Sequence, residues 1–362
     1  MLQLVLYLAV VGLFPAIALA VPSRNTTDTS ICQQLQARLP GKISYPHSST
    51  YTNSLSSYYT DQERQIKSSC IFTPVQTSEV AQFVKIINTH GNATFAVRGG
   101  GHTLWAGAAN AQDGVTVDMR SMRALVLSDD HKVASVGGGA IFSHLYPQLD
   151  QHNLTVMGGR LPGIGVGGFS TGGKSGFSKA CLFVTFLIRF PGGITFQARR
   201  HGWNCDNIYG YEVVLASGEV VYASASSHQD LWLALKGGSN NFGIVTRFDF
   251  AAFEQGDMWG GVVQFNYTQR VVDAQAKAFS AFMETANFDD AAQMGIVLTF
   301  LNPGGVKTVE NTLFYLDPVE KTPAVYQPFT AIPDQTLSQL SVSNVSNVVT
   351  SFGKTLPSTT DR

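Results

Sequence analysis

Three glycine-dense stretches of the chain have the composition of loops that hold a large ligand. They read VRGGGHTLWAG at 97–107, GGRLPGIGVGGFSTGG at 158–173 and KGGSNNFGIVT at 236–246. Glycine lets the backbone approach a ligand closely and presents N–H groups that suit a phosphate. Together they predict a site for a large cofactor with a pyrophosphate. The alternative is that they form tight turns only.

Part of the second stretch also matches a different phosphate-binding motif. Residues 168–175 read GFSTGGKS, which fits the pattern G-x-x-x-x-G-K-[ST] of nucleoside-triphosphate-binding loops. That loop needs a buried strand before it and a helix after it. Pro162, Gly163 and Gly165 interrupt any strand ahead of the motif. The sequence therefore argues against an ATPase or GTPase.

The order of the motifs resembles one known family. RGGGHT (98–103), GVGGFSTGG (165–173), CDNIYGYEVVLASGEVVYASAS (205–226) and DLWLALKGGSNNFGIVTRF (230–248) are similar to the flavin-binding half of the vanillyl-alcohol-oxidase/berberine-bridge-enzyme superfamily. The secreted fungal FAD-linked oxidoreductases are the most similar group. The resemblance implies a PCMH-type domain whose two α+β subdomains hold FAD between them. It also implies a separate domain that covers the flavin and holds the substrate.

The resemblance assigns roles to single positions. His102 matches the histidine that is usually bonded to the flavin 8α-methyl group; a neutral imidazole is a competent nucleophile, and the bond makes the flavin a stronger oxidant. Leu161 stands where some relatives have a cysteine for a second bond, so we expect one covalent link at most. The other expected FAD contacts are Arg98, Gly99, Gly100, Gly101, Thr103, Gly165, Gly167, Gly168, Thr171, Gly172, Asn207 and Ile244.

Residues 174–191 interrupt the second motif. Removing them with one glycine gives GVGGFSTGGGITF, which restores the family pattern. The segment has three basic residues, no acidic ones and an apolar run. That run, of about ten residues, is too short to span a bilayer. We interpret it as a translated intron, because its ends can be encoded by splice-donor and splice-acceptor sequences. The alternative is a genuine surface loop.

The motifs need a scaffold, and the sequence predicts one α+β unit over 66–250, preceded by an N-terminal segment, 21–65. A helix is expected from Thr77, with Thr77 or Ser78 as its cap, because apolar residues follow at helical spacing. Further elements are expected as strands at 94–99, 114–119, 132–139 and 242–250, a hairpin at 211–224, and helices at 140–153 and 230–235.

A second unit follows over 251–362. Strands are expected at 262–265, 296–301 and 312–316, with a long helix at 270–285. The tail then turns polar, and the unit ends before it looks complete. The resemblance implies a further C-terminal segment beside the flavin, so we interpret 251–362 as a partial substrate domain of a truncated chain.

Composition and the N-terminus indicate the compartment. The formal net charge is −1 and 14% of residues are charged, which gives no electrostatic case for nucleic acid or acidic membranes. The apolar run of residues 1–20 ends in Ala18-Leu19-Ala20 and predicts a signal peptide; a membrane anchor is the alternative. Five N-x-[ST] sequons support secretion: Asn25, Asn92, Asn153, Asn266 and Asn344.

The four cysteines fit an oxidising compartment. Cys32 and Cys70 flank the start of the first unit and are expected to form a disulfide, whereas Cys205 is expected as a buried thiol and Cys181 lies in the insertion. The sequence gives no reason to expect a metal site, and we expect a monomer.

The resulting hypothesis is a secreted FAD-dependent oxidase or dehydrogenase. A small-molecule alcohol or secondary metabolite would give hydride to flavin N5, a base would take a proton, and molecular oxygen would accept the electrons. Tyr267, Tyr315 and Asp317 are candidates for that base. One alternative is a non-catalytic flavin-binding remnant. Another is a carbohydrate oxidase, which Leu161 disfavours.

Overall fold

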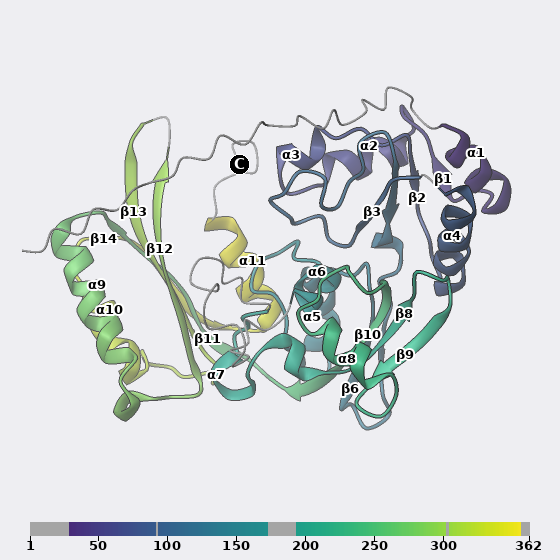
Figure 1. The fold of residues 1–362 in the computed structure, drawn as a ribbon. Helices are drawn as coiled ribbons and strands as arrows, with labels where there is room; N and C mark the ends of the chain where they lie inside the picture. Colours follow the sequence, from purple (N-terminus) through teal and green to yellow (C-terminus); the bar gives the residue numbers. More distant parts are fainter. Residues whose placement is uncertain (1–28, 92, 173–192, 302–303, 356–362) are drawn as a thin grey trace, which may run out of the picture.

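The computed structural model describes residues 29–91, 93–172, 193–301 and 304–355 and arranges them as three sheets with surrounding helices (Figure 1). The helices are α1 (Thr29–Arg38), α2 (Ser49–Ser56), α3 (Asp61–Arg64), α4 (Thr77–His90), α5 (Phe142–Asp150), α6 (Val166–Thr171), α7 (Ala198–His201), α8 (Gln229–Leu235), α9 (Gln269–Phe282), α10 (Gln327–Thr330) and α11 (Val345–Thr355). The strands are β1 (Ile43–Ser44), β2 (Cys70–Phe72), β3 (Phe95–Arg98), β4 (Val115–Asp118), β5 (Leu125–Leu127), β6 (Val133–Gly137), β7 (Leu154–Val156), β8 (Ile208–Val214), β9 (Val220–Ser224), β10 (Ile244–Glu254), β11 (Met258–Asn266), β12 (Ala292–Leu301), β13 (Val306–Tyr315) and β14 (Gln335–Ser343). The expected α+β fold class is confirmed.

The first sheet has the strand order β1-β2-β4-β3, with β2 and β3 parallel to β4. α4 packs the apolar stripe predicted from its sequence into the core of this unit. The predicted cap is wrong, because the N-cap residue is Gln76. The Thr77 hydroxyl instead donates to Glu212 Oε1 at 2.5 Å, and the Glu79 carboxylate accepts the N–H of Val75 at 2.7 Å.

The N-terminal segment is part of this first unit. β1 pairs antiparallel with β2, and the predicted disulfide joins Cys32 of α1 to Cys70 of β2. α2 and α3 then lie on the side of the sheet where the glycine-rich loop after β3 emerges (Figure 1). The N-terminal segment also contacts this loop, because the Tyr59 N–H donates to the Gly101 carbonyl at 2.9 Å.

The second sheet has the order β5-β6-β10-β8-β9, and β7 also pairs with β10. All of its pairs are antiparallel. The expected hairpin is β8–β9, which turns at Gly218 with a φ of 78°. β10 runs on to Glu254, so the last strand of this unit extends past position 250.

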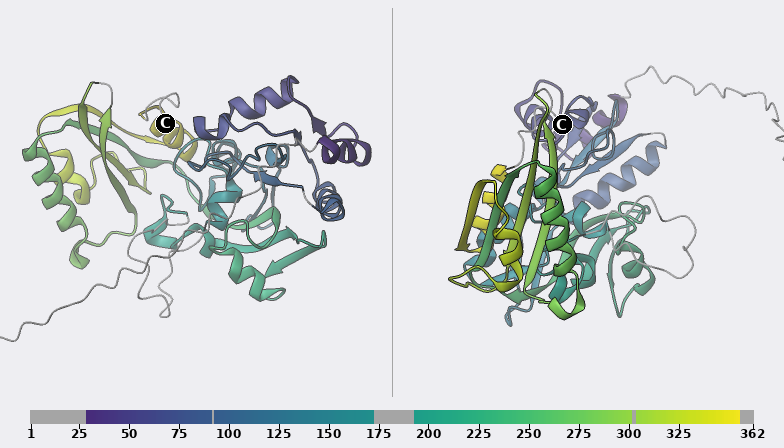
Figure 2. Two further views of the ribbon diagram at one scale, coloured as in Figure 1. Left: turned by 45° about the horizontal axis from the view of Figure 1, so that its top comes forward. Right: turned by 90° about the vertical axis from the view of Figure 1, so that its left-hand side faces the viewer.

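The third sheet, β12-β13-β11-β14, is antiparallel and carries helices on both faces. α9 covers one face, and α11 lies on the other, between this sheet and the unit formed by the first two sheets (Figures 1 and 2). Val345, Val349 and Phe352 of α11 join the same apolar core as α5 and the second sheet. Both β14 and α11 lie in the polar C-terminal tail, for which the sequence predicted no helix or strand.

Several expectations concern residues outside the described part of the chain. These are the signal peptide 1–20, the insertion 174–191 with Cys181, and the sequons Asn25 and Asn92. Of the other sequons, Asn153 and Asn266 are exposed and Asn344 is partly buried. Cys205 is buried, as expected. Within the described ranges no helix has the length and apolar character needed to cross a bilayer.

Candidate functional site

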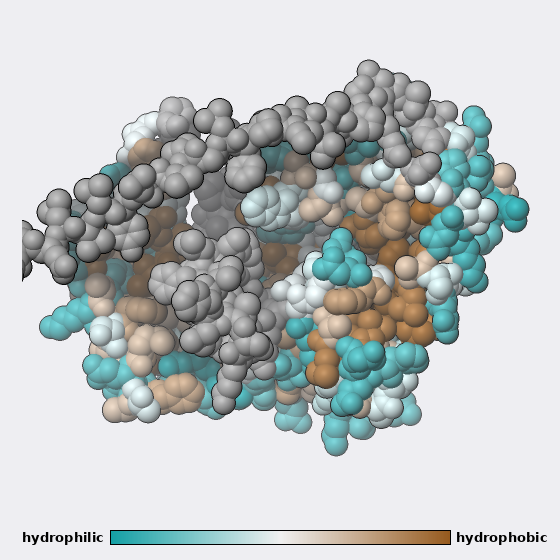
Figure 3. All heavy atoms as spheres, in the orientation of Figure 1, coloured by the Kyte–Doolittle hydropathy of each residue, from teal (hydrophilic) through white to brown (hydrophobic). Residues whose placement is uncertain are grey.

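A cleft of about 770 Å³ lies between the first and second sheets. It is lined by the loop after β3, the turn after β6, the start of α6, the end of β8 and the loop before β10. Hydrophobic surface is exposed in this hollow, between the layers that contain the first and second sheets (Figure 3). A second cavity, of about 740 Å³, lies near Tyr45 and Lys67, and none of the three glycine-rich stretches lines it.

All three predicted glycine-rich stretches reach the first cleft. Gly100 and Gly165 come into direct contact: a Cβ on Gly100 would lie 2.6 Å from the Gly165 Cα, and one on Gly165 would lie 2.3 Å from the Gly100 nitrogen. No side chain other than hydrogen fits between backbones this close. Gly101 adds a φ of 74°, a conformation that other residues rarely adopt.

Gly168 differs from these two glycines. It lines the same cleft, but a Cβ there would meet no protein atom within 4 Å. The space beside Gly168 is therefore open for a ligand that approaches the backbone. Of the predicted cofactor contacts, those that line the cleft are Gly99, Gly100, Gly101, His102, Thr103, Gly165, Gly167, Gly168, Thr171 and Ile244.

His102 is the chemically distinctive residue of the cleft. Among the described residues that line it, only His102 has a titratable side chain. Its ring stacks on Tyr59, with ring centroids 3.8 Å apart and planes 17° apart. Burial lowers the pKa of His102 below its usual value, so the neutral imidazole, a nucleophile, is favoured.

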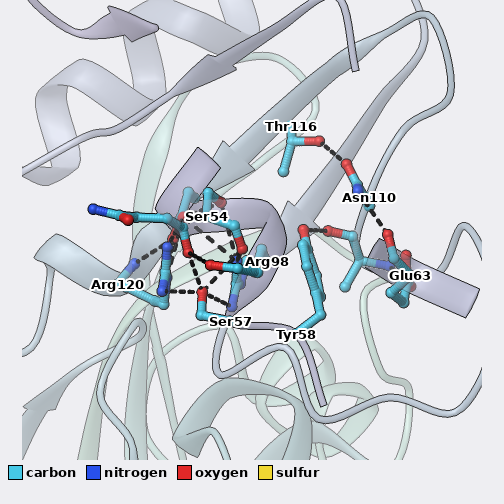
Figure 4. A network of polar contacts seen from close by, with 12 residues as sticks. Ser54, Ser57, Tyr58, Glu63, Arg98, Asn110, Thr116 and Arg120 are labelled. Atoms are coloured by element: carbon cyan, nitrogen blue, oxygen red, sulfur yellow. Dashed lines mark hydrogen bonds and ion pairs between the residues drawn. The ribbon is translucent and has the colours of Figure 1, made fainter. Parts of the chain in front are cut away.

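Arg98, a predicted cofactor contact, is not among the described residues that line the cleft. Its guanidinium is fully buried in a polar network that Figure 4 shows. It donates to the Ser54 hydroxyl at 3.0 Å and the Ser57 hydroxyl at 3.0 Å. It also lies 3.8 Å from the ring centroid of Tyr58 and 3.8 Å from the carboxylate of Asp118. Arg98 therefore holds α2 against the start of the glycine-rich loop.

Asn207 and Gly172 are also absent from the described lining of the cleft. The Asn207 amide donates to the carbonyls of His201 and Trp203, at 2.9 and 2.8 Å, and so closes a local turn. Gly172 is the C-cap of α6. The structure assigns both a local backbone role.

The three candidate bases do not line the cleft either. Tyr315 contacts Tyr326 in the core that α9 covers, on the face of the third sheet turned away from α11. Tyr267 is exposed beside Lys307, and the Asp317 carbonyl accepts the N–H of Trp259. The candidates were chosen by residue type alone, which carries no information about which face of a strand a side chain occupies.

Residues 168–171 do not form a nucleotide-triphosphatase loop. They belong to α6, whereas that motif requires an open loop before the helix. The described residues also contain no group of His, Cys, Asp and Glu side chains suited to a metal ion.

Sequence reasoning missed several parts of the site. Tyr59, which contacts the cleft residue His102, lies in the N-terminal segment 21–65, to which the sequence assigned no cofactor-binding residue. Gly138 and Met119, which line the cleft, carried no distinctive signal. Asn240 and Phe242 lie in a stretch that the sequence did single out, although without assigning them a role. Glycine density was the signal that found the loops.

The composition of the cleft fits FAD. Backbone N–H groups of glycine-rich loops suit a pyrophosphate, and apolar side chains such as Val97, Val214 and Ile244 suit flat ring systems. The open space beside Gly168 leaves room for such a ligand.

Comparison with known proteins agrees with this geometry. Residues 68–181 match a family described as FAD binding domain. The chain is 34% identical over 313 residues to the FAD-dependent monooxygenase sdcF of Emericella nidulans, covering 86% of this chain and 61% of that protein. It is 36% identical over 277 residues to the FAD-dependent monooxygenase tpcD of Cochliobolus heterostrophus, covering 73% of this chain and 50% of that protein.

Solved structures share the fold at lower identity. 6-Hydroxy-D-nicotine oxidase from Arthrobacter nicotinovorans superposes with a TM-score of 0.73 and 20% identity, over 88% of this chain and 65% of that one. Glucooligosaccharide oxidase from Acremonium strictum gives a TM-score of 0.70 and 21% identity, over 90% of this chain and 63% of that one. The chain thus spans about half to two thirds of the length of these relatives. It matches the FAD binding domain family over residues 68–181, is similar to FAD-dependent monooxygenases over most of its own length, and has the fold of these two oxidases.

Proposed function

We propose that this protein is an FAD-dependent oxidase whose flavin is linked to His102 through one covalent bond. The observation that carries the proposal is the placement of His102. It is the single titratable side chain among the described residues of the cleft, and burial favours its neutral form. It also directly follows the glycine loop that approaches Gly165.

The bound flavin would supply the hydride acceptor. The chain's own residues would do the rest: the glycine-rich loops hold the pyrophosphate through backbone N–H groups, and the apolar walls exclude water from the rings. No charged side chain is available among the described lining residues to neutralise the pyrophosphate. Binding would therefore depend on backbone geometry rather than on ion pairs.

Molecular oxygen is the proposed electron acceptor. Relatives at 34% and 36% identity are named FAD-dependent monooxygenases, and the fold neighbour from Arthrobacter is named an oxidase. Both names fit a flavin that reacts with oxygen. Equal yields of hydrogen peroxide and oxidised product would support an oxidase, whereas label from ¹⁸O₂ in the product would support the second candidate, a monooxygenase.

A small-molecule alcohol or secondary metabolite is the proposed substrate. A carbohydrate is the alternative, because fold neighbours include a glucooligosaccharide oxidase described with 6-S-cysteinyl, 8α-N1-histidyl FAD. Leu161 cannot form a cysteinyl bond, and its side chain packs against the apolar core. A panel of oligosaccharides and aromatic alcohols, scored by peroxide release, separates the two classes.

We also propose secretion. The disulfide Cys32–Cys70 suits an oxidising compartment, and the sequons Asn153 and Asn266 lie on exposed positions. Fusing residues 1–28 to a reporter tests this proposal, because a signal peptide directs the reporter to the medium. A reporter that stays inside the cell contradicts it.

The experiment that tests the main proposal is to express residues 21–362 and record the visible spectrum before and after acid precipitation. Flavin absorbance that stays in the acid pellet supports a covalent flavoprotein. A colourless protein that binds added FAD only reversibly and oxidises no substrate supports the alternative, a non-catalytic flavin-binding remnant. A protein that takes up no added FAD contradicts both.

A further inference from the structure

We infer that Tyr59 is a positioning residue for His102: its ring holds the imidazole in the orientation that bonds the flavin. The inference rests on the proposed covalent link. Tyr59 belongs to the segment before residue 68, which lies outside the matched FAD-binding domain. The inference therefore adds the N-terminal segment to the flavin-attachment site.

The first observation is the stack itself. The two rings are stacked, with centroids 3.8 Å apart and planes 17° apart, so the Tyr59 ring contacts one face of the imidazole. At the edge of the ring, Gly163 is a near neighbour, and a Cβ there would make an ordinary van der Waals contact, 3.6 Å from His102 Cδ2. The stack on Tyr59 is therefore the contact that confines the ring, on one face.

The second observation is that Tyr59 and its two neighbours are hydrogen-bonded to the loop that carries His102. The Tyr59 N–H donates to the Gly101 carbonyl at 2.9 Å. The Tyr58 hydroxyl donates to the Ala109 carbonyl at 2.7 Å, and the Thr60 hydroxyl donates to the Thr103 carbonyl at 3.2 Å. Residues 58–60 thus form a strap, and each of its three residues bonds a different point of the loop 101–109.

The third observation is that both ends of the strap are buried and anchored. Tyr58 is buried against the Arg98 guanidinium, which α2 holds through Ser54 and Ser57. After the strap, Glu63 of α3 is buried and accepts the N–H of Ala109 at 2.8 Å. Figure 4 shows these residues on either side of Tyr58. Anchored in this way, the strap holds the Tyr59 ring in place instead of following the motion of His102.

A confined imidazole matters for the bond. Joining a His102 ring nitrogen to the flavin 8α-methyl carbon replaces one C–H bond and one N–H bond by one C–N bond. The two electrons and two protons released go first to the flavin and then to molecular oxygen, which becomes hydrogen peroxide. The bond forms only when the nitrogen faces the methyl carbon, so restricting the ring raises the rate.

The test measures attachment rather than turnover. The full chain is produced without flavin in a riboflavin-limited host, FAD is added, and acid-stable flavin is followed with time. Tyr59→Phe keeps the stack and should attach FAD at nearly the wild-type rate. Tyr59→Leu removes the aromatic face and should slow attachment by about tenfold or more, while reversible FAD binding before attachment is retained. Tyr209→Leu, on an exposed tyrosine outside the described cleft lining, is the matched control and should behave as wild type.

Three outcomes overturn the inference. Wild-type attachment rates in Tyr59→Leu exclude a positioning role. Equal slowing in Tyr59→Phe and Tyr59→Leu assigns the effect to the hydroxyl. A parallel loss of reversible FAD binding and thermal stability in Tyr59→Leu assigns it to folding.

A second measurement covers the case in which Tyr59→Leu does not fold. In the flavin-free chain, the stack should shift the ring-proton NMR signals of His102 upfield, in wild type and in Tyr59→Phe alike. Signals without that shift overturn the inference. A wild-type chain that binds FAD but never becomes acid-stable also overturns it, while an FAD-dependent function still stands.

Discussion

The first and second glycine-rich loops meet at Gly100 and Gly165 but are supported by different means. The first, 97–103, is supported by buried polar side chains: Arg98 bonds Ser54 and Ser57, and the strap 58–60 bonds the loop beyond. The second, 158–172, is supported mainly by backbone bonds and apolar packing, with one buried side-chain bond from the Tyr146 hydroxyl to the Gly159 carbonyl at 2.9 Å. The Val166 N–H donates to the Ala140 carbonyl, and Leu161 and Ile164 pack on the core.

The difference shows which interactions position each loop. Because hydrogen bonds to a guanidinium are directional, the buried bonds of Arg98 fix the orientation of the loop that carries His102. A fixed orientation suits a loop with a reactive side chain. Close backbone contact fixes distance, which suits a loop whose glycines must approach a ligand. A change in one loop should therefore give a different failure from a change in the other.

The largest expected effect comes from the contact between the loops. Gly165→Ala would place a Cβ 2.3 Å from the Gly100 nitrogen, so backbone must move, at a cost of about 3 kcal/mol or more. Gly168→Ala is the matched control: its Cβ meets nothing within 4 Å, and alanine in α6 raises stability by up to about 1 kcal/mol. We expect the first variant to lose folded protein in thermal melts, and the second to fold but bind FAD more weakly. Equal melting temperatures for the two variants would contradict the close contact.

A somewhat smaller effect is expected for the polar support of the first loop. Arg98→Ala removes a buried guanidinium and should lower the free energy of unfolding by about 3 kcal/mol, measured by urea denaturation. Arg120 still bonds Asp118 at 2.6 Å, which limits the loss. Arg200→Ala removes a half-exposed pair with Asp290 and should cost less than about 1 kcal/mol. An Arg98→Ala variant with unchanged stability and weaker FAD binding would restore the original prediction of a direct cofactor contact.

The continuation of the second loop gives the third prediction. Gly193 lies beside Phe169 of α6, since a Cβ on Gly193 would be 3.2 Å from the Phe169 ring. The residues before and after the insertion are therefore close together in space. Lengthening a closed loop adds little to the entropic cost of closing it, about 0.6 kcal/mol of free energy for each doubling of length. Deleting 174–192 should therefore keep the fold and raise soluble yield and bound flavin per protein. Lower solubility or less flavin in the shortened chain would show that 174–191 is a structural element and not a translated intron.

The smallest expected effect concerns charge. Because the described cleft lining holds no charged side chain, reversible FAD binding should change less than about threefold between about 0.01 and about 1 M salt. Fluorescence quenching of FAD by the His102→Ala chain measures this without covalent attachment. A steep loss of affinity with salt would mean that ion pairs hold the pyrophosphate.

Local pattern explains which elements could be predicted. The helical spacing of α4 and the glycine density of the loops are sequence properties, and both led to the right places. Val345, Val348, Val349 and Phe352 also have helical spacing, yet the many polar residues around them hid α11. β14 has no alternating pattern, since most of its residues are exposed, and only its pairing with β11 shows it.

Tertiary contacts explain what could not be predicted at the site. Arg98 precedes three glycines in the sequence, which suggested a phosphate contact, but its position at the end of β3 sends its side chain into the polar network under α2. Tyr59 lies far from His102 in sequence and has no motif of its own. Only the folded strap brings the two rings together.

The central claim is that His102 carries the flavin, and peptide mapping tests it most directly. The chain is expressed with FAD, digested and examined by mass spectrometry. We predict that the peptide containing His102 gains the mass of FAD less two hydrogens, and that His102→Ala loses the adduct while still binding FAD reversibly. An adduct on any other peptide, or an acid-stable adduct that survives in His102→Ala, would contradict the account.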